Sequence, residues 1–390
     1  MKLIVNKIKK YLLLLAIPCL MLIYLPFKKV LPSETLWQIV FVGLGGIILA
    51  LSRSKPFCHW TLSAFWIIIL ARVTLFKPIV PSQMILLAPK MADTYTKRIN
   101  ALGYIVLLIV FIGLFLISQY KEINKDNLMN MICVAAVLLA IWGIVQKTSL
   151  INYLPILKTA SNKQFKLFGP FNILAAGTFL AICLPAFYRT KELVWASSVV
   201  WLGIFLTGRA TGIITAIIVS ILYLISTKLT IVKTIIVCVI CVFGYHYFNK
   251  IDNYNRLLNA DRFIVWQDAF KELPVIGHGV SSWAEIYPYY SRDKKYYWDN
   301  AHNDFVELIF EVGWLSLIPI ILFLGFLSHH LYKLSASAIT GVVGVFIGCC
   351  GFNLMQIAPI ALVACVWIGI CFQEILGNNN NLIIKGDIIR

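Results

Sequence analysis

Long apolar runs separated by short polar connections make up most of this chain. Most runs hold about 17–22 residues, the length that an α-helix needs to cross a bilayer. The pattern predicts twelve membrane-spanning helices, at 11–26, 36–52, 58–76, 101–118, 128–145, 168–188, 193–207, 210–226, 230–248, 304–327, 336–352 and 356–376. We therefore expect an all-α polytopic membrane protein that forms a single integral membrane domain over residues 1–390.

Composition supports this class. Of the 390 residues, 60% are hydrophobic and only 13% are charged, whereas about 25% are charged in a typical soluble domain. The mean hydropathy is +0.84. The N-terminal segment resembles a signal sequence, but no A-x-A-like cleavage site follows it. We interpret it as a first membrane helix that is retained.

The connections differ in length between the two sides of the membrane. If the N-terminus is cytoplasmic, the long connections 77–100, 146–167 and 249–302 all lie on the outer side. The largest, 249–302, joins spans 9 and 10 and is expected to contain short helices. Function usually lies on the side with the long loops. The outer side is also rich in Lys and Arg, which suits an anionic substrate or acidic lipid headgroups.

Common signatures of cofactor or metal chemistry are missing from the sequence. It contains no Walker loop, no G-x-G-x-x-G and no H-E-x-x-H, and no D-x-D pair of acids that could hold a metal–diphosphate complex. No metal, other cofactor or nucleic-acid partner is therefore expected.

Two arginines are candidate anion ligands. Arg209 lies in the stretch LTGRATG, at the outer tip of a predicted helix hairpin, and Arg262 begins a predicted amphipathic helix with Trp266 one turn later. Pro274 and nearby glycines should end that helix. A guanidinium group can hold phosphate oxygens in a bidentate way. The alternative is that each arginine is an ordinary interfacial residue.

His302 is the candidate base. It lies in residues 299–305, with the sequence DNAHNDF, immediately before an apolar run. Asn303 or Asp304 could cap the following helix, and the positive helix end would keep the imidazole neutral and able to accept a proton. Asp299 and Glu307 are near enough in sequence to orient it. The alternative is a capping or packing histidine.

Other polar and aromatic residues of this region are also candidates. His278, between Gly277 and Gly279, is the rival histidine. Glu307 and Glu311 lie one turn apart on the predicted helix, where a buried acid needs a partner or a function. An aromatic group suits either a membrane-interface belt or sugar stacking. Its members are Tyr287, Tyr289, Tyr290, Tyr296, Tyr297 and Trp298.

Taken in order, these segments resemble the O-antigen ligase/polymerase family. The matching positions are Arg262–Trp266, Pro274–Gly277 with Gly279, Ala301–Asn303, Glu307 and Glu311-x-Gly313, preceded by Gly169–Asn172, Pro185 and Gly208–Arg209. The resemblance covers roughly residues 165–315. It implies a GT-C-type glycosyltransferase in the bacterial inner membrane, with its active site facing the periplasm.

The resemblance also implies substrates and roles. The donor would be a glycan on undecaprenyl diphosphate, and the acceptor would be a hydroxyl of lipid A–core. Arg209 and Arg262 would bind the diphosphate, His302 would be the catalytic base, and Arg72, Asn303 and Glu307 are added as candidate substrate-binding residues. Attack opposite the leaving group predicts inversion, without metal or nucleotide.

Three alternatives stay open. An O-antigen polymerase would use a second lipid-linked unit as acceptor. A protein O-oligosaccharyltransferase is disfavoured, because such relatives often carry an extra soluble C-terminal region that is not evident after the last predicted span. A transporter or flippase for an anionic lipid could use basic cavities, but it would be expected to show internal repeats, and none is convincing.

Overall fold

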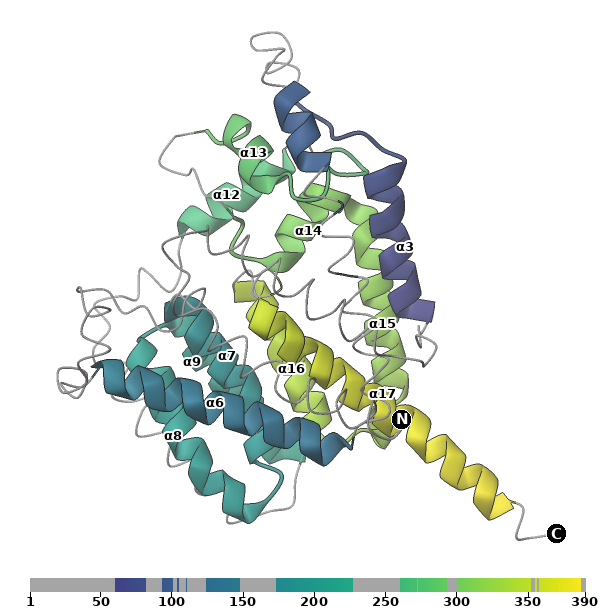
Figure 1. Cartoon of the computed structure of the whole chain (residues 1–390). Coiled ribbons are helices and arrows are strands. Elements are labelled where there is room, and N and C mark those ends of the chain that lie inside the picture. Colours follow the sequence, from purple (N-terminus) through teal and green to yellow (C-terminus); the bar gives the residue numbers. More distant parts are fainter. Residues whose placement is uncertain are drawn as a thin grey trace, which may run out of the picture.

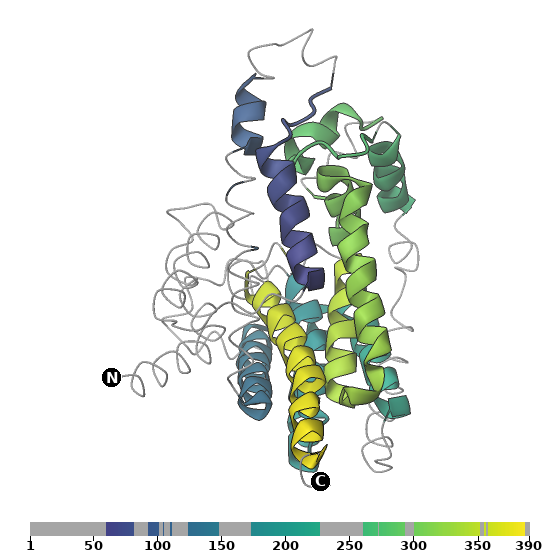
Figure 2. The ribbon, with the colours of Figure 1, turned by 90° about the vertical axis from the view of Figure 1, so that its right-hand side faces the viewer.

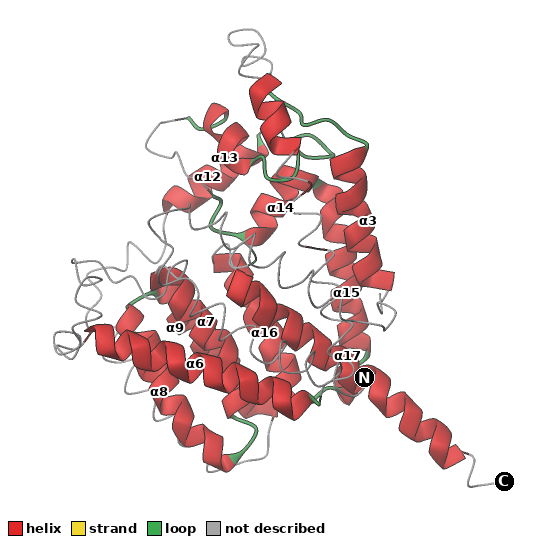
Figure 3. Ribbon diagram, viewed as in Figure 1, coloured by secondary structure: helices red, strands yellow, loops and turns green. Residues whose placement is uncertain are grey.

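The computed structural model describes the helical core and much of the region around the candidate site. The described residues are 60–81, 93–100, 104, 110, 124–147, 173–226, 260–271, 273–292, 300–351, 355 and 358–386. Within them every regular element is a helix (Figure 3). Several predictions lie outside the described residues: the spans 11–26, 36–52 and 230–248, nearly all of 101–118, Gly169–Asn172, and Asp299.

A group of packed helices, here called the lower bundle, forms one part of the molecule (Figure 1). It consists of α6 (Lys125–Lys147), α7 (Ile173–Phe187), α8 (Lys191–Thr207), α9 (Ala210–Ser226), α16 (Ala336–Gly351) and α17 (Ala358–Gly386). Helix α7 packs against α6, α8, α9 and α16, so it is central to the bundle. Gly212 of α9 lies directly on Gly177 of α7, where a Cβ would come within 2.6 Å of backbone. Small residues allow this approach between membrane helices.

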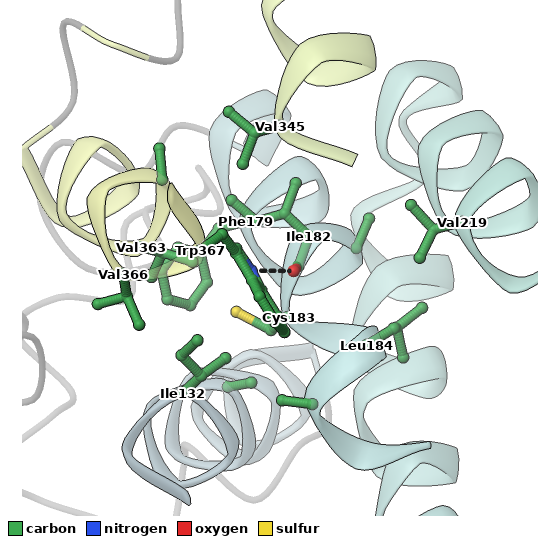
Figure 4. Packing of buried hydrophobic residues seen from close by; sticks show 14 of the residues in the cluster. Ile132, Phe179, Ile182, Cys183, Leu184, Val219, Val345, Val363, Val366 and Trp367 are labelled. Atoms are coloured by element: carbon green, nitrogen blue, oxygen red, sulfur yellow. Dashed lines mark hydrogen bonds between the residues drawn. The ribbon is translucent and has the colours of Figure 1, made fainter. Parts of the chain in front are cut away.

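The core of the lower bundle is almost entirely apolar. Trp367 of α17 lies at its centre, fully buried, among the side chains of α6, α7 and α16 (Figure 4). Its indole N–H donates to the carbonyl of Ile182 over 3.0 Å, so the one polar atom of this ring is satisfied.

An upper layer covers one end of the lower bundle. It consists of α12 (Ala260–Phe270), α13 (Trp283–Ile286) and α14 (Asp304–Val312), with the short 3-10 helices η3 (Tyr287–Tyr289) and η5 (Trp314–Ser316). Helices α3 (Trp60–Thr74) and α15 (Leu317–His329) lie side by side along the edge of the molecule and reach this layer (Figures 1 and 2). The loop predicted at 249–302 therefore does contain short helices.

The predicted span 304–327 is wrong as a single helix. The structure divides it at Gly313 into α14 and α15, joined by η5. Gly313 has φ 89° and ψ 177°, which is not a helical conformation and is reached essentially only by glycine. Helix α17 also continues past the predicted end at 376, to Gly386. The other predicted spans that fall on described residues are helical.

Helix length bears on the membrane topology. Among the described helices, the segment Lys125–Val145 alone is long and apolar enough to cross a membrane by itself, and several others are apolar but hold 10–17 residues. A full crossing needs about 20 residues. The helical, apolar architecture is thus confirmed, and the twelve-span topology stays a prediction.

Candidate active site

Arg262 lies where the upper layer meets the lower bundle. It is on the first turn of α12, and its Nη1 donates to the carbonyl of Gly351 over 2.9 Å, at the C-terminal end of α16. The side chain is half-buried, and burial lowers the pKa of Arg262 from its ordinary value. The guanidinium is therefore partly desolvated, which strengthens its attraction for an anion.

Arg209 lies in the turn between α8 and α9. Gly208 ends α8 in the left-handed conformation, with φ 62°, as is common for a glycine just past a helix. Arg209 is exposed. Two residues on, Thr211 packs against Gly351 so closely that a Cβ on Gly351 would lie 2.5 Å from its Cγ2. The turn that carries Arg209 and the side chain of Arg262 thus both contact Gly351.

These two arginines differ from others in their partners. Arg292 pairs with Asp268 over 2.7 Å, Arg98 with Glu285 over 2.9 Å and Arg189 with Asp126 over 3.1 Å. Within the described part of the chain, neither Arg209 nor Arg262 pairs with a carboxylate. Two cations without carboxylate partners at one end of α16 can accept an anionic ligand.

His302 lies in the turn before α14, half-buried, in an unusual backbone conformation. Its φ is 52°, in the left-handed region, which costs a residue with a Cβ roughly 1–2 kcal/mol. Such residues cluster at functional sites and persist where the surroundings fix them. His302 and Ser281 are the non-glycine residues with positive φ in the described part of the chain.

The residue after His302 caps helix α14, as predicted. Asn303 Oδ1 accepts from the N–H groups of Phe305 (2.9 Å) and Val306 (3.1 Å). Its Nδ2 donates to the carbonyl of Cys350 over 3.0 Å. Asn303 is buried, so these bonds tie the start of α14 to the end of α16.

The imidazole of His302 is neutral at physiological pH. Burial, followed by the positive charge of Arg262, lowers the pKa of His302 to about 4. The predicted neutral state is thus supported, with burial as the first cause and Arg262 as the second. A neutral imidazole beside a guanidinium can accept a proton while the guanidinium holds a negative charge.

The two glutamates of α14 bond to backbone N–H groups. Glu307 Oε2 accepts from Ala301 over 3.1 Å, and Glu311 Oε1 accepts from Trp283 over 3.2 Å. Both residues are on α14, as predicted. Glu307 thus contacts the residue just before His302, and Glu311 holds the start of α13.

Arg72 lies near the other end of α14 from His302, close to Glu311 and His278. It is 3% exposed, and its guanidinium donates to the carbonyls of Ile276 (2.6 Å) and Gly277 (2.9 Å). That loop crosses the far end of α14, where a Cβ on Gly277 would lie 2.5 Å from the carbonyl oxygen of Glu311. With its donors on backbone carbonyls, Arg72 positions this loop, and its substrate-binding role stays a prediction.

The rival histidine and one of the described tyrosines are fully buried. His278 is fully buried, its Nδ1 lies 2.9 Å from the carbonyl of Ile79, and its ring packs on Phe310. Tyr287 is fully buried and stacks on Trp283. Neither can meet a sugar, whereas Tyr289 is 40% exposed. Tyr296, Tyr297 and Trp298 lie outside the described residues.

Trp266 has a role that its sequence position did not reveal. Its Nε1 donates to the carbonyl of Ala301 over 2.9 Å. The only signal in the sequence is its place one turn after Arg262, on the same face of α12.

Comparison with known proteins bears on the family that the chain resembles. Residues 194–321 match the family model of the O-antigen ligases, a segment that runs from α8 into α15 and includes Arg209, Arg262 and His302. No match was found among curated proteins. The predicted resemblance is thus confirmed over this segment, which is similar to the O-antigen ligase domain.

Proposed function

We propose that the protein is an O-antigen ligase. It moves glycan from undecaprenyl diphosphate to a hydroxyl of lipid A–core, at the periplasmic face of the bacterial inner membrane. The observation that carries the proposal is the convergence of Arg262, the Arg209 turn and the loop of His302 on the end of α16. The matched family segment contains all three.

The chemistry follows from these groups. The acceptor hydroxyl oxygen attacks the anomeric carbon of the donor sugar and forms the new glycosidic bond. The bond from that carbon to the diphosphate oxygen breaks, and undecaprenyl diphosphate leaves with the electron pair, opposite the attacking oxygen. His302 accepts the hydroxyl proton, and Arg209 and Arg262 stabilise the charge that develops on the leaving group.

Donor binding also makes His302 a stronger base. In the free protein the charge of Arg262 is one of the causes that lower the pKa of His302. A bound diphosphate compensates that charge, so the pKa of the imidazole rises when the donor is in place. The base is therefore strongest when there is a substrate to activate.

A genetic experiment tests the proposed reaction and its acceptor. If the protein is a ligase, polymerised glycan should accumulate on undecaprenyl diphosphate in a strain without this gene. None should be attached to lipid A–core. Wild-type protein should restore the attachment, and variants with Arg209→Ala or Arg262→Ala should not. Lysine at either position should restore it only in part, because the planar fork is lost.

Two other outcomes would redirect the assignment. Single glycan units on lipid A–core, without polymer on the carrier, would identify an O-antigen polymerase with a lipid-linked acceptor. Loss of attachment, with lipid-linked glycan trapped on the cytoplasmic face, would identify a flippase instead.

A further inference from the structure

Ala301 precedes His302, and side chains bind both its backbone N–H and its carbonyl group. The N–H of Ala301 donates to Glu307 Oε2 over 3.1 Å, and its carbonyl accepts from Trp266 Nε1 over 2.9 Å. Ala301 is fully buried. Its backbone groups are therefore satisfied away from water by two residues that are far apart in sequence.

The residue after His302 is fixed as well. Asn303 binds two N–H groups of α14 and the carbonyl of Cys350. His302 is thus the link between two anchored neighbours, and it has the left-handed φ of 52°. A conformation that is unfavourable for a residue with a Cβ needs such anchors on both sides.

Trp266 connects this turn to the candidate diphosphate ligand. It follows Arg262 by four residues on α12, so both side chains project from one face of the helix. One reaches the end of α16, and the other reaches the turn before α14. Helix α12 therefore sets the spacing between the guanidinium and the imidazole.

We propose that Trp266 and Glu307 are positioning residues that hold His302 in its left-handed conformation at a fixed place beside Arg262. This inference rests on the proposed function, in which His302 is the base. The pair does not touch the reacting atoms. It keeps the imidazole aimed at the acceptor hydroxyl, and a displacement of about 1 Å at such a group can cost about 10²-fold in rate.

The first test removes one hydrogen bond and keeps an aromatic ring. In purified full-length protein, Trp266→Phe should lower single-turnover transfer roughly 10- to 100-fold and leave donor affinity within about twofold. The matched control is Trp367→Phe, which removes the same kind of bond, from an indole to a backbone carbonyl over 3.0 Å, in the core of the lower bundle. The control should change thermal stability without changing the rate per folded molecule.

The second test uses Glu307. Glutamine keeps an oxygen that can accept from Ala301, and alanine does not. Glu307→Gln should therefore retain more of the transfer rate than Glu307→Ala, with similar donor affinity in both. Equal losses in the two variants would mean that the carboxylate charge matters rather than the bond to Ala301.

The pH profile supplies a readout that a merely structural role would not move. The ionisable groups on the described elements around the imidazole are Asp261, Arg262 and Asp268 on α12, Asp304, Glu307 and Glu311 on α14, and Cys349 and Cys350 at the end of α16. In Trp266→Phe the loosened turn exposes His302 to water and moves it from Arg262, so its pKa rises toward the ordinary value. The acid limb of the transfer rate should shift to higher pH in this variant and stay in place in Trp367→Phe.

The outcomes separate this inference from the proposed function. If His302→Ala abolishes transfer while Trp266→Phe works at the wild-type rate with an unchanged acid limb, the positioning role is wrong and the base assignment stands. If His302→Ala still transfers glycan normally, the base assignment itself is wrong.

Discussion

The lower bundle and the upper layer are held together by different interactions. In the lower bundle, apolar side chains and small residues pack closely, as where Gly341 lies against the ring of Trp367. In the upper layer, buried and half-buried side chains with polar atoms bind the backbone of other segments: Arg72, Trp266, Asn303, Glu307 and Glu311. Packing tolerates small shifts between helices, whereas hydrogen bonds fix particular backbone atoms. The difference places the precise geometry in the upper layer, where the candidate base lies.

The largest effect on stability is expected at the crossing between the 275–277 loop and α14. A Cβ on Gly313 would lie 2.1 Å from the carbonyl oxygen of Val275, at a φ of 89°. Gly313→Ala should therefore cost about 3 kcal/mol or more and reduce transfer per folded molecule. Thermal unfolding in detergent and a transfer assay measure the two effects. Gly325→Ala is the matched control on α15, where nothing lies within 4 Å, and a similar loss in that variant would contradict the crossing as the cause.

A smaller effect is expected from Arg72, which holds the same loop. Arg72→Met keeps the apolar stem and removes the donors to Ile276 and Gly277. The loss should be roughly 1.5–3 kcal/mol, because the lost bonds involve a charged, buried donor. Donor affinity measured on the folded protein should be nearly unchanged. A large drop in donor affinity with normal stability would instead support the predicted substrate-binding role of Arg72.

The lower bundle should respond to overpacking in stability alone. A Cβ on Gly341 would lie 2.2 Å from the ring of Trp367, so Gly341→Ala should cost about 1–3 kcal/mol. Transfer per folded molecule should fall less than in Gly313→Ala. The opposite ranking of the two variants would mean that the bundle, rather than the upper layer, sets the geometry of the site.

The smallest effect is expected at an exposed ion pair beside the upper layer. Lys97 and Asp93 lie 2.7 Å apart, with side chains 76% and 63% exposed. Lys97→Ala should change stability by no more than about 0.5 kcal/mol, by the same thermal assay. A loss of donor binding in this variant would indicate that the surface charge helps to attract the anionic donor.

Sequence patterns predicted the parts of the molecule that depend on periodicity and local chemistry. The helices of the lower bundle follow from apolar runs, α12 from its amphipathic spacing, and the cap at Asn303 from residue type. The break at Gly313 was missed because it depends on a backbone crossing with residues some forty positions earlier. The contacts of Arg72 and Trp266 were missed for the same reason, since hydropathy carries no information about side chain–backbone bonds between distant segments.

The role of His302 is tested by single-turnover transfer in purified protein that has been loaded with the lipid-linked donor. His302→Ala should bind the donor with near wild-type affinity and transfer glycan about 10²–10⁴-fold more slowly, whereas Arg262→Ala should lose donor affinity. Transfer by His302→Ala at the wild-type rate, or a loss of donor binding that accounts for all of its defect, would contradict the assignment of His302 as the base.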